Sequence, residues 1–393
     1  MITDCLSAEE LDILKKMKDS RAVSPLLLEA FKEGGFKYIY QTAKRDPELE
    51  ICMRGNDDSI IIYYHNHILW ELSLSNDRCR VSVSFNHARY CKDYHDKWEK
   101  LKKYGFDLNK SEFRLIPTYK TNKSGKQYLQ GAVSSSNGKL NSYDVKNEKF
   151  ATETLKVMKE IIDDFFDANK TTDYFKTDWN KDHPDNQIKI NKKRKTPCIE
   201  KRWQQSLYRK MKDLHDGYYA YDLEFSQKFP NLDIRKKMEE NVNEPDMLAI
   251  RYENHKPRAM VLIEVKSTWS ACAGKSGIKK HLIGMNAYSK SDIFIPNRKK
   301  EAKQILEQYK ELELISAETD TNIPERIDVE RLLILTDNSI KEKEYTQEMK
   351  KENVYKSAID YYKKNKSDID DLARENDCKI LMIEGKYWED YRI

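Results

Sequence analysis

Two short segments in the second half of the chain decide its fold: EPDMLAI at residues 244–250 and MVLIEVKS at residues 260–267. Each contains an apolar run of strand length with charged residues at one end. Side chains at positions i and i+2 of a strand share a face. Glu264 and Lys266 are therefore expected to project together, while Val265 points to the opposite, buried side.

Asp246 stands at the start of the first of these strands, and in an antiparallel pair its carboxylate is expected beside Glu264. Two carboxylates that converge on one point repel each other unless a positive charge lies between them. A hard divalent cation such as Mg²⁺ or Mn²⁺ prefers oxygen ligands and would fill that place. Lys266 could hold or help deprotonate a water while the metal polarises a phosphate, so the pattern indicates phosphodiester hydrolysis.

The Glu-x-Lys pattern alone carries little weight, because it recurs at residues 301–303, 348–350 and 384–386. The first two copies lie in polar, helical sequence, where positions i and i+2 do not face each other. The third has no acidic strand start ahead of it. Only the copy at 264–266 follows an apolar strand that is itself preceded by a Pro-Asp strand.

The order of elements around these segments indicates an α/β domain with a central mixed sheet. Hydrophobic periodicity predicts a helix over 199–214, three strands, two helices, a further strand, two more helices and a last strand. The predicted strands are 218–225, 247–252, 260–265, 331–335 and 379–383, and the two helices in the middle are 278–289 and 298–312.

In its motif and in this order of elements, the chain resembles the PD-(D/E)XK nuclease superfamily over residues 198–340. The motif stands here as Pro245-Asp246 and Glu264-Val265-Lys266. The resemblance implies a restriction-endonuclease-like fold, Mg²⁺-dependent (or Mn²⁺-dependent) cleavage of nucleic acid, and metal ligands at Asp246, Glu264 and Val265. It also implies a catalytic role for Glu200 on the first helix, besides Asp246, Glu264 and Lys266.

The chain departs from two branches of that superfamily. The Gln-x-x-x-Tyr motif of the RecB-like exonucleases is absent from the helix after Lys266, where His281 and Tyr288 stand nearest, and no glutamine replaces Glu264 as in the Mrr-like branch. We therefore expect an endonuclease rather than a processive exonuclease. His281 itself is interpreted as an ordinary histidine on the surface of a helix, with contact to the substrate as the alternative.

The first part of the chain predicts a separate α+β domain over residues 1–168, which we interpret as a recognition or sensor module. Ser7 with Glu10, and Ser24 followed by Pro25, are typical helix starts. From about residue 48 the pattern changes to β-strands. The polar segment 169–197 predicts a linker, so that the nuclease domain would occupy 198–393.

The bulk composition favours a globular protein with a highly charged surface, because 39% of its 393 residues are hydrophobic and 35% are charged. No apolar run approaches the roughly 20 residues that span a bilayer, and no secretory signal is present, so we expect a cytoplasmic protein without a membrane partner. Its seven cysteines form no C-x-x-C pair, which favours free thiols over disulfides or structural zinc.

Positive charge is concentrated between residues 191 and 216, where nine basic and three acidic residues give +6 in a chain whose net charge is only +5. Such a local excess suits a polyanionic partner, although a solvated helix face and linker remains the alternative. The residues predicted to bind nucleic acid are Lys192, Lys193, Arg194, Lys195 and Lys275. Lys275 lies in the loop that follows the strand with Glu264 and Lys266.

DNA is the expected substrate, with RNA left open, and the chain could act as a monomer or a homodimer. A role in restriction or antiviral defence is an analogy with other proteins that couple such domains. The alternative function is a catalytically silent protein that binds nucleic acid through a nuclease-like fold.

Overall fold

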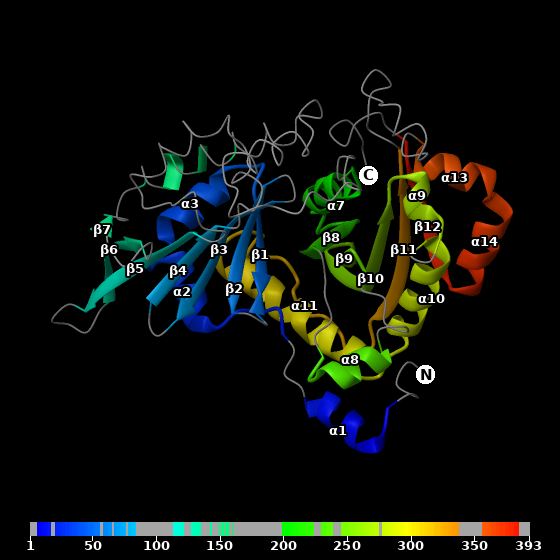
Figure 1. The fold of residues 1–393 in the computed structure, drawn as a ribbon, viewed down its shortest axis with the longest axis horizontal. Coiled ribbons are helices and arrows are strands. Elements are labelled where there is room, and N and C mark those ends of the chain that lie inside the picture. Colours follow the sequence, from blue (N-terminus) through cyan, green and yellow to red (C-terminus); the bar gives the residue numbers. More distant parts are fainter. Residues whose placement is uncertain are drawn as a thin grey trace, which may run out of the picture. The chain divides into compact units, whose positions relative to one another are not determined.

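A computed structural model describes the chain as two compact units, Ala22–Pro197 and a second unit made of Met1–Arg21 with Cys198–Ile393. The residues described are 6–16, 20–55, 58–64, 67–75, 78–83, 113–121, 127–134, 142–143, 148, 151–153, 155–156, 159, 199–223, 229–238, 245–274, 277–337 and 356–384. The predicted linker 169–197 and the basic residues 192–195 lie outside them. Each unit is described separately below, and Figure 1 labels the elements of both.

The unit Ala22–Pro197 contains an antiparallel sheet whose seven described strands follow one another in chain order, and two helices precede this sheet in the chain. The helices are α2 (Pro25–Lys32) and α3 (Lys37–Arg45). The strands are β1 (Glu50–Arg54), β2 (Ser59–Tyr64), β3 (His67–Ser75), β4 (Arg78–Val83), β5 (Phe113–Thr121), β6 (Gln127–Ser134) and β7 (Ser142–Tyr143).

The core of this unit forms where β-branched and aromatic residues concentrate. Every residue of β2 is buried, and Trp70 on β3 is fully buried beside it. The predicted start of α2 is confirmed, because the Ser24 hydroxyl accepts a hydrogen bond from Leu27 N and Pro25 is the first helical residue. Asp58 then accepts hydrogen bonds from the Ser24 amide and hydroxyl, which ties the helix start to the turn before β2.

The second unit is built on a mixed sheet in the order β12-β11-β10-β9-β8. Strands β8, β9 and β10 pair antiparallel, whereas β10, β11 and β12 pair parallel. Its strands are β8 (Tyr218–Leu223), β9 (Met247–Glu253), β10 (Lys256–Lys266), β11 (Asp328–Thr336) and β12 (Cys378–Ile383). This mixed α/β architecture agrees with the class expected from the sequence.

Helices pack on both the antiparallel and the parallel part of this sheet (Figure 1). Helix α7 contacts β8 and β10, α10 contacts β10 and β11, and α14 contacts β12. The described helices are α1 (Ala8–Lys16), α7 (Ile199–Lys210), α8 (Leu232–Met238), α9 (Trp269–Cys272), α10 (Ile278–Ser289), α11 (Phe294–Glu311), α13 (Ala358–Lys364) and α14 (Lys366–Glu375). Within the described ranges, none of them has both the length and the apolar character to cross a membrane.

Strand β10 is the central strand, and it is buried from Ala259 to Lys266. A strand covered on both faces reads as a continuous apolar run, which explains the sequence of residues 259–263. It is longer than predicted because the turn before it is tight. Asn254 and His255 both have positive φ, 50° and 61°, as a two-residue hairpin with the twist of its strands requires.

Residues 1–21 group with the second unit, whereas the sequence placed them in the first domain. The predicted Ser7–Glu10 capping box does start α1, and Glu10 also lies 2.7 Å from the ammonium of Lys237 on α8. Arg21 Nε lies 3.2 Å from the carboxylate of Asp222 on β8, and both side chains are buried. Sequence patterns cannot reveal such pairs, because the partners are some 200 positions apart.

Loss of the Arg21 guanidinium should destabilise this unit strongly, because it leaves the buried Asp222 carboxylate without that charge. We expect Arg21→Ala to lower the free energy of unfolding by about 3–5 kcal/mol. Arg374→Ala, which removes the exposed partner of Asp371, should change it little. Urea unfolding of both variants is the measurement, and equal stabilities would show that the N-terminal segment is not anchored as described.

Candidate active site

The candidate site lies where β9 begins and β10 ends. In the antiparallel pair, Met247 is opposite Ile263, so Asp246 falls next to the last residues of β10. Its Oδ2 accepts a hydrogen bond of 2.7 Å from Val265 N. The sequence prediction that Asp246 lies beside the Glu-x-Lys segment therefore agrees with the structure.

Glu264 and Lys266 form an ion pair on one face of β10. Lys266 Nζ lies 2.6 Å from Glu264 Oε1, and the two side chains are only 6% and 1% exposed. Val265, between them, is fully buried in the apolar core. The alternation expected from the strand period places these three residues as predicted.

Glu200 reaches the same place from α7, with its Oε1 at 3.8 Å from Lys266 Nζ. The helix is held there by Trp203, whose fully buried indole donates a hydrogen bond of 3.0 Å to the carbonyl of Asp337. Asp337 directly follows β11, whose C-terminal end lies beside that of β10 because the two strands are parallel. This contact explains how a helix residue far away in sequence joins the site.

His281, on α10, also belongs to the site. Its Nδ1 lies 2.7 Å from Glu264 Oε1, and its side chain is 16% exposed, so the interpretation as a surface histidine is wrong. The available signal was helical spacing: Ile278, Leu282 and Met285 are buried on α10, and position 281 lies next to that apolar face. Spacing alone could not tell which strand end this face covers.

The electrostatics of the site are dominated by buried carboxylates. Burial raises the pKa of Asp246 well above its usual value, and the neighbouring charges of Glu264 and Glu200 raise it further. The pKa of Glu200 is also raised, first by burial and then by Glu264, against the opposing charge of Lys266. The Val265 amide and Lys266 only partly offset these effects at Asp246.

Lys266 is held in its charged form. Burial alone would lower its pKa, but the charges of Glu264, Glu200 and Asp246 outweigh burial and raise the pKa above its usual value. A lysine in this state can orient a water or stabilise negative charge, but it cannot accept a proton near neutral pH. In the metal-free protein this charged form is compatible with holding a water, and the role of Lys266 stays a prediction.

A thiol near the site is not available as a nucleophile. Cys272, on α9, is buried, and burial raises the pKa of its thiol to about 12, with Lys266 opposing and Glu200 adding to the shift. The thiolate is the reactive form of cysteine. The groups available for chemistry at the site are therefore its carboxylates, its lysine and His281.

The donor atoms of the site fit a hard divalent cation. Glu264 Oε2 and Glu200 Oε2 are buried and have no hydrogen-bond partner among the described residues, and such oxygens are costly to bury unless something positive pairs with them. Across the described ranges, no group of three or more His, Cys, Asp or Glu side chains is placed to hold a metal by itself. Mg²⁺, however, commonly binds through one or two carboxylates, with waters and substrate phosphates completing its ligands.

The remaining predicted site residues lie in parts of the chain that the structure does not describe. Lys275 and the cluster of Lys192, Lys193, Arg194 and Lys195 lie outside the described residues. Ser267, which directly follows the Glu-x-Lys segment, is fully buried, and its hydroxyl has no hydrogen-bond partner among the described residues. The structure thus brings together Asp246, Glu264, Lys266 and Glu200, and it adds His281.

The raised pKa of Asp246 predicts how metal-free stability depends on pH. An acid whose pKa is higher in the folded state binds more protons there, so its contribution to stability falls as pH rises above the unfolded value of 3.8. Asp246→Asn has no carboxylate to ionise at this position, so the loss of stability described for the wild type is absent. We therefore expect this variant to become more stable relative to the wild type as pH rises. Thermal melts in EDTA between pH 4 and pH 8 measure the difference.

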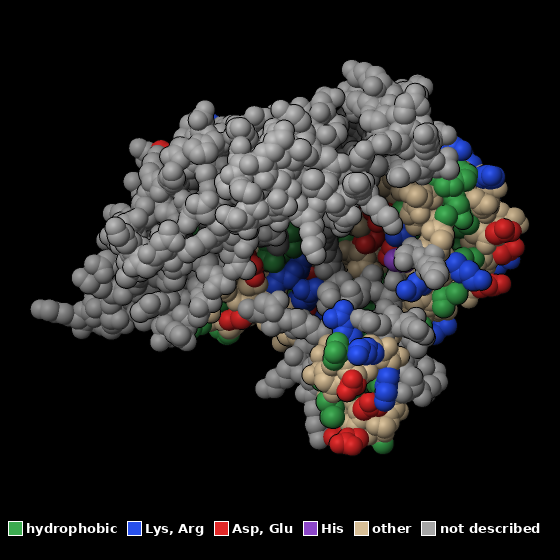
Figure 2. All heavy atoms as spheres, in the orientation of Figure 1, with side chains coloured by type: hydrophobic (Ala, Val, Ile, Leu, Met, Phe, Trp, Pro, Cys, Tyr) green, Lys and Arg blue, Asp and Glu red, His purple; other side chains and the backbone are tan. Residues whose placement is uncertain are grey.

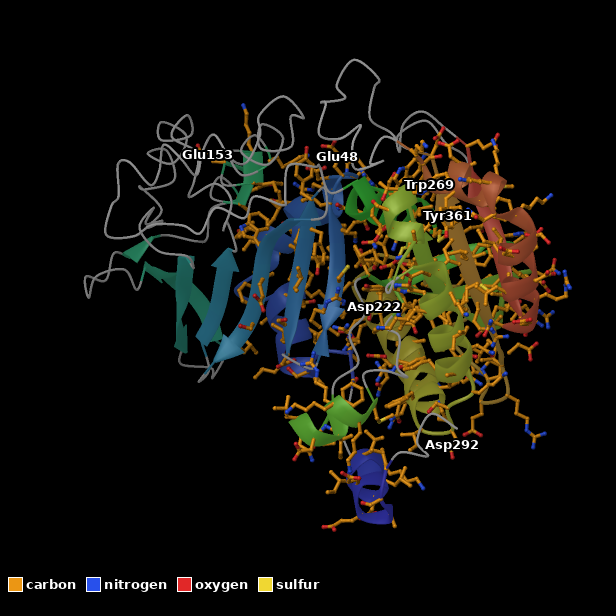
Figure 3. The ribbon with its side chains drawn as sticks, turned by 45° about the vertical axis from the view of Figure 1, so that its right-hand side comes forward. Glu48, Glu153, Asp222, Trp269, Asp292 and Tyr361 are labelled. Atoms are coloured by element: carbon orange, nitrogen blue, oxygen red, sulfur yellow. The ribbon has the colours of Figure 1, made fainter. Side chains whose placement is uncertain are left out.

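The control is Asp292→Asn, which removes an exposed carboxylate of the same unit (labelled in Figure 3). It should track the wild type across this pH range. If Asp246→Asn also tracks the wild type, the Asp246 carboxylate is not held in the unfavourable surroundings described here.

Comparison of the chain with protein-family models, with curated proteins and with solved structures finds no match. The functional argument consequently depends on the residues of the site and on the sheet that positions them.

Proposed function

We propose that this protein is a metal-dependent nuclease that hydrolyses phosphodiester bonds, with DNA as its substrate and internal cleavage as its mode. The observation that carries the proposal is the buried Glu264–Lys266 ion pair, with Asp246 hydrogen-bonded to the amide between them. A buried pair of this kind contributes little to stability compared with apolar residues of similar size. Its place at the end of the central strand is better explained by chemistry.

Each group of the site has a role in this mechanism. Asp246 and Glu264 would hold Mg²⁺ or Mn²⁺, with the main-chain oxygen of Val265 as the further predicted ligand. When bound, the metal would polarise the scissile phosphate and lower the pKa of a coordinated water. Lys266 would orient the attacking water and stabilise the charge that develops on the phosphate oxygens. Glu200 would act on the metal through water.

His281 adds a positioning role that the sequence motif does not contain. Its contact with Glu264 Oε1 leaves Oε2 of the same carboxylate for a metal, and a partner on one oxygen fixes the direction of the other. We assign it to orienting Glu264 rather than to contact with the substrate.

The family assignment is part of the same proposal. The observed order supports a restriction-endonuclease-like core of the PD-(D/E)XK kind: α7 comes first, then the antiparallel strands β8, β9 and β10, then a helical crossover to parallel β11. Asp246 directly precedes β9, and Glu264 and Lys266 lie at the end of β10, which supports this assignment. The unit Ala22–Pro197 would serve in recognition.

One observation favours the silent nucleic-acid-binding alternative. In the structure as described, Lys266 pairs with Glu264, and no three-ligand metal cluster is formed in advance. A protein that had lost cleavage but kept the fold would have the same internal pairing. Activity measurements with defined substrates separate the two functions.

Lys266→Ala should lower cleavage by about 10²–10⁴-fold, the usual effect of removing a group that acts in the transition state, while nucleic-acid binding persists. Asp246→Ala should lose cleavage together with Mg²⁺-dependent stabilisation. The assay is single-turnover cleavage of supercoiled plasmid, linear duplex and single strands at saturating protein, with Mg²⁺ or Mn²⁺, alongside melting temperature against metal concentration.

The matched controls lie at the other end of the same hairpin. Lys256→Ala and Glu253→Ala change exposed residues at the start of β10 and the end of β9, and both should cleave as the wild type does. If the wild type binds but cuts none of these substrates with either metal, the silent alternative is correct. Normal cleavage by Lys266→Ala would instead show that the site is assigned wrongly.

A further inference from the structure

An aromatic and basic patch lies directly beyond the candidate active site. We call it the Trp269 patch and define it by four residues from α9, α13 and the segment before α13: Trp269, Lys356, Tyr361 and Lys364. The rings of Trp269 and Tyr361 meet edge to face, with centroids 5.1 Å apart and planes at 83°. Figure 3 shows the two rings side by side.

Two ammonium groups lie over the same indole. Lys356 Nζ is 5.0 Å and Lys364 Nζ 5.6 Å from the centroid of the Trp269 ring. The indole itself is half-buried, as is Tyr361, and Lys364 is exposed. Each cation–π contact at such a surface is weak, so two lysines beside one indole are not explained by stability alone.

The patch is joined rigidly to the active strand. Trp269 follows Lys266 by three residues, and its amide donates a hydrogen bond of 2.8 Å to the Lys356 carbonyl. The amide of Ala358, at the start of α13, bonds in turn to the carbonyl of Ser267 at 3.2 Å. The spacing between patch and site is therefore fixed by main-chain contacts.

The surroundings of the patch contain exposed lysines together with the exposed carboxylates of Asp360 and Glu384, whereas the site itself is rich in buried carboxylates. Lys279 and Lys280 on α10 are exposed, and α10 is the helix that carries His281 into the site. Lys363 on α13 is exposed as well and pairs with Glu384 at 3.3 Å. In Figure 2, Lys and Arg side chains are seen on the surface where α10 and α13 lie. A basic surface with a flat aromatic side chain next to a phosphodiester-cleaving centre suits a nucleic-acid strand.

We propose that the Trp269 patch binds an unpaired nucleotide of the substrate, with the base stacked on Trp269 and the neighbouring phosphates paired with Lys356 and Lys364. This inference rests on the proposed nuclease function and deepens it. Bases inside a duplex are stacked on each other and present only their edges to a protein, so the patch selects single-stranded or locally unpaired substrate. Stacking on an aromatic ring tolerates any base.

The test compares two replacements of the same side chain by equilibrium binding in EDTA, where no cleavage occurs. Trp269→Phe keeps a flat ring, and Trp269→Leu keeps apolar bulk without one. We expect Trp269→Leu to bind single-stranded DNA about 5- to 150-fold more weakly, which corresponds to the stacking of one base. Trp269→Phe should retain most of the affinity, and the blunt duplex of the same sequence should show no such difference.

A strand of abasic sites supplies phosphates without bases, so its affinity should be insensitive to the Trp269→Leu change. Tyr218→Leu, which alters a half-buried aromatic at the far end of β8, is the control for general loss of structure. Melting temperatures of all variants show whether each one folds.

The lysines are tested by the salt dependence of binding. Lys364→Gln should reduce the slope of log affinity against log salt by about 0.7 on single strands, the value for one lost phosphate contact. Lys256→Gln, at the far end of β10, should leave the slope unchanged. This variant pair tests the patch even if a Trp269 variant fails to fold.

Equal binding of single strands by the Trp269→Leu and Trp269→Phe variants overturns the inference. A loss of affinity in Trp269→Leu that is as large for the duplex and the abasic strand as for the single strand also overturns it. The latter result would identify a plain anion site. The outcome is independent of cleavage: a chain that cuts no substrate yet loses single-strand binding on Trp269→Leu removes the proposed function but keeps the patch. If the protein cleaves a substrate but Trp269→Leu leaves its affinity for single strands unchanged, the proposed function is kept and the inference about the patch is wrong.

Discussion

The buried ion pair between Glu264 and Lys266 is the constraint around which the second unit is arranged. Charges are expensive to remove from water, and two of them can be buried only where neighbouring groups are placed to compensate. The end of the central strand is such a place, because the segment directly before β9 and the helices α7 and α10 each supply one group to it. Asp246, Glu200 and His281 come from these elements and converge within a few ångströms of the pair.

That arrangement is costly for the metal-free protein. Three carboxylates face one lysine and one histidine. The pKa values of Asp246 and Glu200 are raised, in both cases mainly by burial and further by the charge of Glu264. The rest of the unit follows the ordinary rules of packing: apolar strands, a tight hairpin and helices with buried faces. A local violation of those rules within a well-packed core is characteristic of a functional site, where unfavourable surroundings are kept for the sake of a ligand.

The sequence was sufficient for the parts of the site that depend on local periodicity. Because side chains alternate along a strand, Glu264 and Lys266 lie on one face and Val265 lies on the other. The short hairpin between β9 and β10 then brings Asp246 next to Glu264 and Lys266. His281 and Arg21 were missed because their positions depend on which helix face covers which strand end, and on contacts between residues far apart in sequence. Short helix α8 was also missed, since its seven residues give too little periodic signal.

The separation of acidic centre and basic surroundings resolves a difficulty in the proposed function. A site with an excess of carboxylates repels a polyanion, so affinity for nucleic acid has to come from other residues. In the proposed function, the lysines of α10 and of the Trp269 patch would provide that attraction. They lie close to the site along the main chain, because Trp269 is only three residues beyond Lys266. Binding energy gained on the patch would then hold a phosphate against the repulsion of the site until a metal compensates it, as binding at non-reacting positions contributes to catalysis in enzymes generally.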